Sequence, residues 1–417
     1  MKKSDSHPFY NLPSYKEILF KKDVTLLPSV TELFELELAF LEYQSLTKNQ
    51  LVERAAYLQS INGSHTNHYL MYNQSSDVLT KDRSALTKSY FENSTFSTGY
   101  ATHGLFPYRG KFHPQLIKAL LNIIGIKKGQ TILDPMCGSG TANIEAALMG
   151  INSYAVDISP FCQFMTQTKY EALKLSKDSL SLLSQKHEKL FDFFCDENVF
   201  DRLKKNEDTE KLRIYHLSLL AFLDAMGYSK RVVKSNHKQL FQKVLLRYEN
   251  TVSAFLNNPY FKNKQLGELM VLSSSDALGL DLEDNSIDGV VTSPPYSFAI
   301  DYAKNDESQL SYLGNDVQQL KSKMIGLIGK NKNERLKNYF RDMKKVCSEI
   351  HRVLKSGKYF IMIIGSNTNQ TGGIRLENTI INNCEEIGMP LIKSILKPIK
   401  GMRNTMKNEY LLFFRKK

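Results

Sequence analysis

The sequence predicts an α/β protein built around a parallel β-sheet. Residues 131–160 read as a short apolar strand, a glycine-rich loop, a helix that begins near Thr141 and a second strand, which together form one βαβ unit. Four further apolar segments predict strands, at residues 269–278, 287–296, 358–365 and 408–416. A long helical segment separates the second predicted strand from the third, so we expect a helical insertion in the sheet domain.

The chain is long enough for two or three domains, because it has 417 residues and a domain usually takes about 100–200. Changes of pattern divide it into four segments: a mixed N-terminal region at 1–95, the first part of the sheet domain at 96–161, the helical insertion at 162–267 and the second part of the sheet domain at 268–417.

Helices are predicted wherever apolar residues recur at helical spacing between charged ones. Residues 31–58 predict one helix, and the polar, Ser- and Asn-rich stretch at 60–77 predicts a loop. Residues 115–124 predict a helix with one apolar face, followed by a turn from Gly125 to Gly129. The insertion at 162–267 reads as almost entirely helical.

The chain carries an excess of positive charge, with a formal net charge of +12. Residues 321–358 concentrate it, since Lys and Arg there outnumber Asp and Glu by twelve to three. Cationic side chains release counterions from phosphates, so a nucleic acid is one partner that would explain the excess. A solvated basic surface is the alternative.

The five cysteines are scattered and include no CxxC pair, which fits a reduced protein without a disulfide framework. No cluster of His, Cys, Asp or Glu has the spacing of a metal site. No apolar run approaches the roughly 20 residues that cross a membrane, and residues 1–17 lack the apolar core of a signal peptide. We therefore expect a cytoplasmic protein with no metal and no membrane partner.

A glycine-rich loop follows the first predicted strand and is a candidate ligand site. It runs Asp134-Pro135-Met136-Cys137-Gly138-Ser139-Gly140-Thr141. Glycines let the backbone approach a ligand closely, and the helix that follows offers free N–H groups. The loop is neither the GxGxxG of nicotinamide enzymes nor the phosphate-binding GxxxxGK loop. A purely structural turn is the alternative.

Two carboxylates follow the next two strands. Asp157 comes about 20 residues after the loop, where an acidic residue can hold both ribose hydroxyls of a nucleoside cofactor. A helix cap or a surface carboxylate is the alternative. Asp276 follows the third strand and could accept a hydrogen bond from the amine of an adenine ring, or cap a helix together with Ser273 to Ser275.

The fourth strand ends on a turn of unusual composition, Thr292-Ser293-Pro294-Pro295-Tyr296. Proline cannot donate to a sheet ladder, so the strand has to stop there. The result is a rigid turn that carries a hydroxyl and an aromatic ring. An edge strand stopped by prolines, without further function, is the alternative interpretation.

Together these stretches resemble the S-adenosylmethionine-dependent DNA amino-methyltransferases, which methylate exocyclic nitrogens. DPMCGSGT at 134–141 looks like that family's cofactor loop, and TSPPY at 292–296 looks like its catalytic motif. YRGKFHPQLIKALL at 108–121 resembles the family's upstream motif, which lies against the methionine part of the cofactor. The resemblance covers residues 100–160 and 265–417 and leaves out the N-terminal region and the insertion.

The resemblance implies a Rossmann-like class I methyltransferase sheet with a C-terminal β-hairpin, and S-adenosyl-L-methionine as the cofactor. The residues that it assigns to cofactor binding are Phe112, Pro114, Asp134, Pro135, Cys137, Gly138, Ser139, Gly140, Thr141, Asp157, Ile158 and Asp276. Those that it assigns to catalysis are Ser293, Pro294, Pro295 and Tyr296. Arg109 and Lys111 could meet a phosphate or the cofactor carboxylate. His103 and His113 are expected to pack or to contact phosphate.

The catalytic roles follow from the chemistry of an exocyclic amine. Its lone pair is delocalised into the base, so the amine has to be held in line and its hydrogens drawn to acceptors. By resemblance the Pro294 carbonyl accepts one hydrogen, and the Ser293 hydroxyl can accept another and relay the proton. Tyr296 offers a flat face to a base swung out of the duplex, and Phe298 either extends that wall or only packs.

Ser293 at the first position of the motif favours cytosine N4, with adenine N6 as the alternative. Methylation at cytosine C5 needs a cysteine nucleophile, which that family carries after a proline, and no Pro-Cys pair occurs here. The sequence therefore predicts a site-specific, cytosine-N4-specific DNA methyltransferase, the modification part of a restriction–modification system. The expected partner is double-stranded DNA, and a cognate restriction endonuclease could act on the same site. An RNA guanine-N2 methyltransferase and a non-catalytic DNA-binding module are the rival predictions.

Target recognition has two candidate segments. One is the insertion at 162–267, whose basic stretch at 227–239 could follow a DNA backbone. The other is the N-terminal region, whose Asn-, Tyr- and His-rich stretch at 62–73 could read base edges. The motif order resembles an arrangement in which the recognition region follows the third strand, yet here the long segment precedes it.

Overall fold

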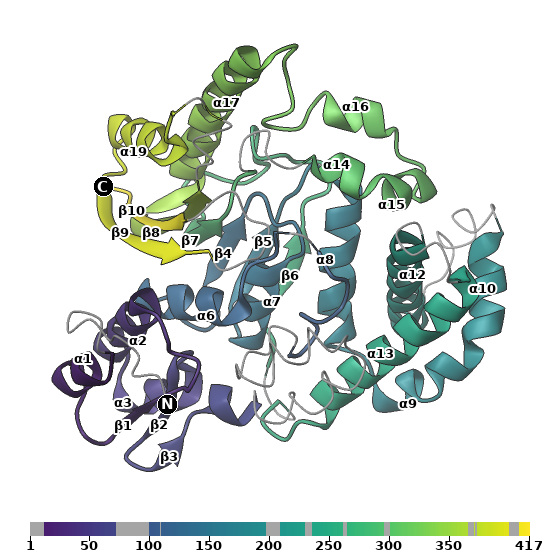
Figure 1. The fold of residues 1–417 in the computed structure, drawn as a ribbon, viewed down its shortest axis with the longest axis horizontal. Coiled ribbons are helices and arrows are strands. Elements are labelled where there is room, and N and C mark those ends of the chain that lie inside the picture. Colours follow the sequence, from purple (N-terminus) through teal and green to yellow (C-terminus); the bar gives the residue numbers. More distant parts are fainter. Residues whose placement is uncertain are drawn as a thin grey trace, which may run out of the picture. The chain divides into compact units, whose positions relative to one another are not determined.

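The computed structural model describes most of the chain: residues 12–71, 100–108, 110–196, 209–229, 236–261, 265–295, 301–365, 371, 373–399 and 408–417. The chain forms two compact units. The first is Met1–Thr98 with His113–Ile126, and the second is Gly99–Phe112 with Lys127–Lys417. Figure 1 follows the chain from purple at the N-terminus to yellow at the C-terminus.

The described part of the first unit combines helices with a small antiparallel sheet. Its elements are α1 (Leu12–Leu19), β1 (Val24–Leu26), α2 (Leu33–Ser45), α3 (Lys48–Arg54), β2 (Leu58–Ile61), β3 (Ser64–His65) and α6 (Pro114–Ile123). β2 pairs antiparallel with both β1 and β3. The helix predicted at 115–124 is confirmed as α6.

The single helix predicted at 31–58 is wrong, because the chain forms α2 and α3 there and then enters β2. Thr47 separates the two helices by capping the second. Its hydroxyl accepts from the backbone N–H of Gln50, and the Gln50 side chain accepts from the backbone N–H of Thr47. This reciprocal capping box begins a new helix where the apolar periodicity alone suggested a continuous one.

The loop predicted at 60–77 is also wrong in its first part, which is a β-hairpin. Asn62 and Gly63 form the turn between β2 and β3, with φ angles of 48° and 77°. An Asn-Gly pair is the favoured sequence for such a two-residue turn. Residues 72–77 lie outside the described residues.

A buried carboxylate fastens α6 to the rest of the first unit. Glu42 accepts from Asn122 Nδ2 on α6 at 2.6 Å and from the backbone N–H groups of Ala56 and Tyr57. Burial raises the pKa of Glu42 to about 7, although these donors favour its ionised form. The segment that contains α6 therefore belongs by its contacts to the first unit.

The second unit is built on a seven-stranded sheet with the order β6-β5-β4-β7-β8-β10-β9. Its strands are β4 (Thr131–Asp134), β5 (Asn152–Ala155), β6 (Leu269–Val271), β7 (Ile287–Thr292), β8 (Leu354–Gly365), β9 (Leu391–Pro398) and β10 (Asn408–Arg415). Strands β4 to β8 pair in parallel, and β10 pairs antiparallel with β8 and β9. The predicted Rossmann-like methyltransferase sheet with a C-terminal β-hairpin is confirmed (Figure 1).

The predicted helical insertion lies between β5 and β6. The described helices of the second unit, inside and outside this insertion, are α7 (Thr141–Leu148), α8 (Pro160–Ala172), α9 (Lys177–Leu180), the 3-10 helix η2 (Leu183–Lys186), α10 (His187–Cys195), α12 (Thr209–Ser229), α13 (His237–Asn257), α14 (Tyr302–Asn305), α15 (Glu307–Tyr312), α16 (Val317–Lys321), α17 (Lys332–Val353) and α19 (Leu376–Glu386). Among the described residues, no helix combines the length and the apolar character that a membrane span requires.

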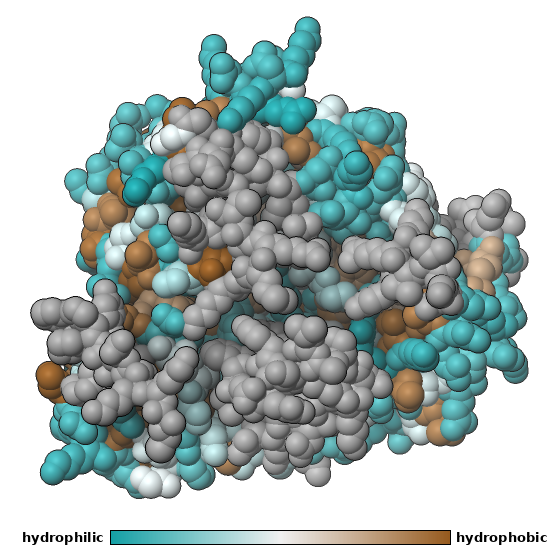
Figure 2. All heavy atoms as spheres, viewed as in Figure 1, coloured by the Kyte–Doolittle hydropathy of each residue, from teal (hydrophilic) through white to brown (hydrophobic). Residues whose placement is uncertain are grey.

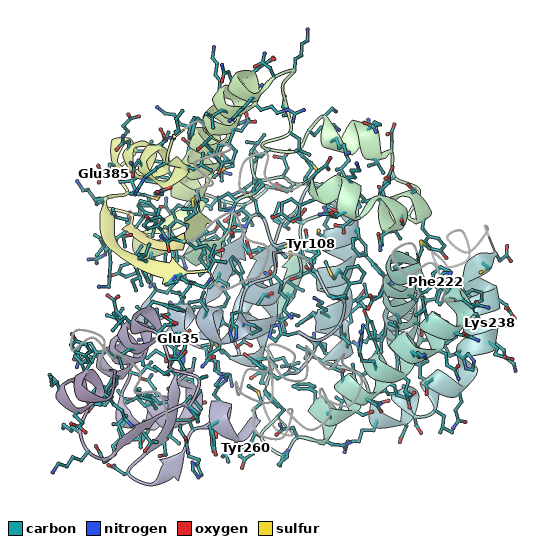
Figure 3. All side chains as sticks on the ribbon, viewed as in Figure 1. Glu35, Tyr108, Phe222, Lys238, Tyr260 and Glu385 are labelled. Carbon is teal, nitrogen blue, oxygen red and sulfur yellow. The ribbon has the colours of Figure 1, made fainter. Side chains whose placement is uncertain are left out.

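The insertion has an aromatic core of its own. Phe194, Phe222 and Phe241 come from α10, α12 and α13, and their ring centroids lie 5.3 to 6.2 Å apart. Phe222 is labelled among these helices in Figure 3. Aromatic rings at this spacing stabilise a core beyond their buried area, so the insertion is a packed helical body joined to the sheet.

The order of the strands reverses at β4, and this reversal fixes where a ligand can bind. From β4 the strand order runs through β5 to β6 on one side, whereas β7 and β8 lie on the other side. The loops that follow β4 and β7 therefore diverge at the carboxyl edge, and ligands of open α/β sheets bind at such a point. These two loops carry the predicted cofactor loop and the predicted catalytic turn.

Candidate active site

The loop after β4 requires its glycines. Gly138 and Gly140 have φ angles of 50° and 73°, in the left-handed region that favours glycine. A Cβ on Gly140 would also lie 2.6 Å from Thr166 Cγ2 on α8. Because α8 packs this closely, the last turn of the loop has no room for a side chain.

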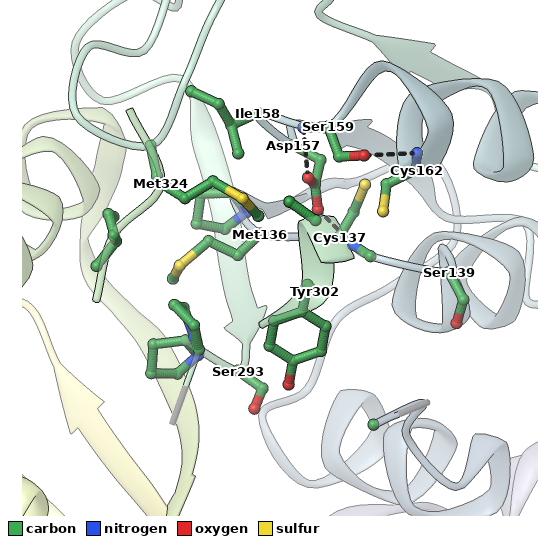
Figure 4. A pocket seen from close by; sticks show the side chains of 18 of the residues that line it. Met136, Cys137, Ser139, Asp157, Ile158, Ser159, Cys162, Ser293, Tyr302 and Met324 are labelled. Atoms are coloured by element: carbon green, nitrogen blue, oxygen red, sulfur yellow. Dashed lines mark hydrogen bonds between the residues drawn. The ribbon is translucent and has the colours of Figure 1, made fainter. Parts of the chain in front are cut away.

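Asp157 holds the loop from the end of β5. Its Oδ2 accepts from the backbone N–H of Gly138 at 2.9 Å, and its Oδ1 accepts from that of Ser159 at 2.8 Å (Figure 4). Desolvation raises the pKa of Asp157 to about 6, although both donors favour the ionised form. The carboxylate is thereby oriented before any ligand arrives, and each oxygen keeps a further lone pair for one.

Asp134 connects the cofactor loop to the catalytic turn. Its Oδ1 accepts from the Thr292 hydroxyl at 2.7 Å and from the backbone N–H of Met136 at 3.2 Å. Burial raises the pKa of Asp134 to about 7. Thr292 directly precedes Ser293, so this carboxyl group fixes the end of β7 relative to the loop after β4.

A pocket gathers the loop and the catalytic turn at the carboxyl edge of the sheet (Figure 4). The predicted cofactor residues that line it are Phe112, Pro135, Cys137, Gly138, Ser139, Thr141, Asp157, Ile158 and Asp276. The predicted catalytic residues that line it are Ser293, Pro294 and Pro295. Two motifs that are far apart in the sequence therefore open into one space.

The remaining predicted residues lie elsewhere. Asp134 and Gly140 are not among the lining residues and act on the shape of the loop. Pro114 is the first residue of α6, in the first unit, and its role in cofactor binding stays a prediction. The predicted contacts that lie outside the described residues are those of Arg109, Tyr296 and Phe298.

The pocket also has lining residues to which the sequence analysis assigned no role in binding or catalysis. The lining residues that sequence reasoning missed include Tyr108, Met136, Ser159, Cys162, Ala277, Leu278, Tyr302, Asp306, Lys323, Met324 and Leu327. Several of them come from the segment after the catalytic turn, between α14 and α17. Tyr108 and Met136 lie within motifs that had been singled out, and Lys323 lies in the basic stretch, so their position could have signalled these three residues.

Buried basic side chains stand close to the cofactor loop without forming a metal site. Lys169 Nζ donates to the Ser139 carbonyl at 3.1 Å, and burial lowers the pKa of Lys169 well below its usual value. His103 Nε2 lies 2.8 Å from Glu145 Oε1, and burial lowers the pKa of His103 to about 4. In the described part of the chain, no three His, Cys, Asp or Glu side chains are grouped to hold a metal.

The basic stretch follows the pocket wall into α17, whose buried side is apolar and whose opposite side carries the cations. Some charges are matched, since Lys321 lies 2.9 Å from Asp301 and Lys344 lies 2.8 Å from Glu386. The side chains that project over α17 at the top of Figure 2 are hydrophilic. This exposed cationic side is available to a polyanion next to the pocket.

Comparison with known proteins agrees with this geometry. Residues 287–417 match a family model described as DNA methylase, of the N6/N4 methyltransferases, and residues 105–214 match an RMKL-like methyltransferase domain. Residues 287–417, which run from β7 to the C-terminus, are thus similar to the N6/N4 methyltransferases. The two matches cover both motifs of the pocket, the loop after β4 and the turn after β7.

Individual relatives are similar to this chain over only part of their own length. Type II methyltransferase M.BsoBI of Geobacillus stearothermophilus is 26% identical over 344 residues, 67% of this chain and 66% of that protein. Type II methyltransferase M.MjaII of Methanocaldococcus jannaschii is 30% identical over 168 residues, 38% of this chain and 32% of that protein. A tRNA (guanine(10)-N2)-dimethyltransferase of Methanothermobacter thermautotrophicus is 37% identical over 83 residues, 19% of this chain and 25% of that protein. The chain thus spans less than two thirds of the two type II relatives.

The pocket fits S-adenosyl-L-methionine, the cofactor of this domain type. Asp157 would accept from the ribose hydroxyls, and Asp276, whose Oδ1 also accepts from Leu278 N at 2.7 Å, would accept from the adenine amine. Lys111 lines the pocket and would pair with the cofactor carboxylate. Gly138 lines the pocket and has no side chain that would fill it.

Proposed function

We propose that this protein is a site-specific DNA methyltransferase that transfers a methyl group from S-adenosyl-L-methionine to N4 of cytosine in double-stranded DNA. The observation that carries the proposal is the single pocket shared by the loop residue Gly138, the carboxylate Asp157 and the turn Ser293–Pro295. A cofactor held by the first two would present its reactive end toward the third. We further propose that the enzyme is the modification component of a restriction–modification system.

The turn after β7 supplies the acceptors that the reaction needs. When bound, S-adenosyl-L-methionine supplies an electrophilic methyl group on a sulfonium. The Pro294 carbonyl accepts one hydrogen of the target amine, and the Ser293 hydroxyl accepts the other, so the nitrogen lone pair is directed at the methyl carbon. As the new C–N bond forms, the bond between the methyl group and the sulfonium sulfur breaks and leaves a neutral thioether, and Ser293 relays one amine proton toward solvent. The bond from Thr292 to Asp134 keeps the turn from moving away during the step.

Cytosine N4 is preferred over adenine N6 because the residue before the prolines is Ser293. By resemblance, Asp or Asn in that place goes with adenine. The names of the type II relatives specify no base, so they are compatible with either amine.

Double-stranded DNA is the proposed substrate because a cationic surface borders the pocket. The exposed side of α17 and the loop before it would neutralise phosphates on either side of the target base. A restriction endonuclease that cuts the same site is the proposed biological partner, by analogy with type II methyltransferases.

A second candidate function is methylation of guanine N2 in tRNA. It is favoured by the 37% identity to a tRNA (guanine(10)-N2)-dimethyltransferase over 83 residues. Guanine also presents an exocyclic amine, so the same pair of acceptors could serve it.

One experiment separates these functions. The full-length protein is incubated with methyl-labelled S-adenosyl-L-methionine and either unmethylated plasmid DNA or unmodified tRNA, and the products are digested to nucleosides for mass spectrometry. The proposal expects N4-methylcytosine from DNA and no label in tRNA. N6-methyladenine would refute the base assignment, N2-methylguanine would establish the second candidate, and no label in either would refute methyl transfer to nucleic acid.

A further inference from the structure

The pocket has an aromatic wall on α14 that no sequence motif marks. Tyr302 is the first residue of α14 and lines the pocket together with Ser293 and Pro294. Its ring is almost parallel to that of Tyr108, with an interplanar angle of 16° and centroids 6.3 Å apart. In Figure 4 the hydroxyls of Tyr302 and Ser293 point to the same side of the pocket.

Contacts of neighbouring residues fasten the helix that carries this ring. Asp301 caps α14 and lies 2.9 Å from Lys321 Nζ on α16. The next helix, α15, is tied to the insertion because Gln309 Nε2 donates to the Leu223 carbonyl at 3.0 Å. The start of α14, where Tyr302 lies, and the next helix are therefore each fastened to a neighbouring element.

Two glycines let the tyrosine rings approach the backbone. A Cβ on Gly138 would lie 3.2 Å from Tyr108 Cε1, and a Cβ on Gly110 would lie 3.2 Å from the Tyr302 hydroxyl. Tyr108 thus packs on the cofactor loop, whereas Tyr302 packs on the upstream segment. The two rings occupy different parts of the pocket wall, although they face each other.

Tyr302 follows the same strand as the catalytic turn. The carboxylates that suit adenosine, Asp157 and Asp276, follow β5 and β6 on one side of β4. Ser293 and Tyr302 both follow β7, on the other side of β4. Tyr302 and the catalytic turn therefore belong to the same connection after β7, and both line the pocket.

We propose that Tyr302 stacks on the target base after the base leaves the duplex, an inference that rests on the proposed DNA methyltransferase function. A flat ring binds any base through its π-face, and stacking offsets the cost of extruding the base. Ser293 and Pro294 then hold the amine, while Tyr302 holds the plane of the ring. The assignment adds a base-binding residue that lies outside the catalytic turn.

The test compares the full-length wild type with Tyr302→Ala, Tyr302→Phe and a control, Tyr260→Ala, which makes the same change away from the pocket (Figure 3). Single-turnover methyl transfer is measured on a duplex with one methylation site, mapped first with the wild type. The target base is either paired normally or placed opposite an abasic position, where extrusion is easier. The affinity for S-adenosylhomocysteine is measured by calorimetry.

Tyr302→Ala should lower the rate on the paired duplex about tenfold or more, and less on the abasic duplex, because stacking is then needed less. Tyr302→Phe keeps the ring and should recover most of the rate, and the cofactor affinity should change less than about twofold. If Tyr302→Ala does not fold, Tyr302→Leu, which keeps bulk without a flat face, carries the same comparison. An unchanged rate, an equal loss on both duplexes, or a cofactor affinity that falls as far as the rate would overturn the inference. No transfer by the wild type would instead overturn the proposed function.

Discussion

The ribose-binding role of Asp157 can be tested by removing its carboxylate. In Asp157→Ala the cofactor would lose a charged acceptor, and a hydrogen bond to a charged group contributes about 1.5–3 kcal/mol. At about 1.4 kcal/mol per tenfold, the dissociation constant for S-adenosylhomocysteine should rise between about tenfold and about a hundredfold. Asp157→Asn should do no better, because its NH2 group would face one of the two backbone N–H donors, from Gly138 or Ser159.

The pH dependence gives this prediction a second readout. The pKa of Asp157 is raised from 3.8 to about 6 in the folded protein. Ribose hydroxyls bind best to the ionised form, so wild-type affinity should strengthen as the pH rises through about 6 and then level off. Without the cofactor, the stability of the folded protein depends on pH in the opposite direction to the cofactor affinity. A carboxyl with a raised folded pKa contributes stability below its unfolded pKa, and that contribution is lost as the pH rises through about 6.

The assay is isothermal calorimetry between pH 5.5 and 8, with thermal unfolding to show that each variant is folded. Asp284→Ala is the control, since Asp284 is an exposed aspartate outside the pocket. Its affinity should match the wild type at every pH. If folded Asp157→Ala binds the cofactor as tightly as the wild type and keeps the same pH profile, the ribose assignment is refuted.

Three further predictions concern the DNA surface, the base and the loop. Three lysines of the basic stretch are exposed, and no ion pair is found for them among the described residues: Lys323, Lys330 and Lys337. Changing all three to Gln should lower the slope of log K for DNA against log salt by about 2–3, at about 0.9 per phosphate contact, and an unchanged slope would make the stretch a solvated face only. Tyr296→Phe should keep most activity on a matched duplex, whereas Tyr296→Ala should lose about tenfold or more, because stacking contributes about 1–3 kcal/mol per base. The cofactor affinity of Tyr296→Ala should change little. Equal turnover by wild type and Tyr296→Ala would show that another group holds the base. Gly140→Ala should lower the free energy of unfolding by about 1 kcal/mol or more in addition to the loss caused by Gly129→Ala. Both glycines have positive φ, but only a Cβ at Gly140 meets Thr166. Equal urea midpoints for the two variants would contradict the tight contact.

The sequence was informative wherever function requires particular chemistry at consecutive positions. Gly138 and Gly140 could be recognised because positive φ angles and a close helix leave glycine as the suitable residue. The paired prolines Pro294 and Pro295 could be recognised because proline cannot donate to a sheet ladder and therefore ends a buried strand. Strand β9 was harder to locate, because only one of its eight residues is buried and it shows no apolar run.

Only the tertiary structure decided how distant segments share one pocket. Tyr108 and Tyr302 lie far apart in the second unit's sequence, and their nearly parallel rings depend on packing that no local pattern encodes. The helix α6 belongs to the first unit because Glu42 and Asn122, far apart in the chain, form a buried hydrogen bond. By itself, the sequence determined the backbone geometry and the reactive groups, since these depend on neighbouring residues. The walls of the pocket and the membership of each unit depend on contacts between remote residues, which are formed only when the whole chain folds.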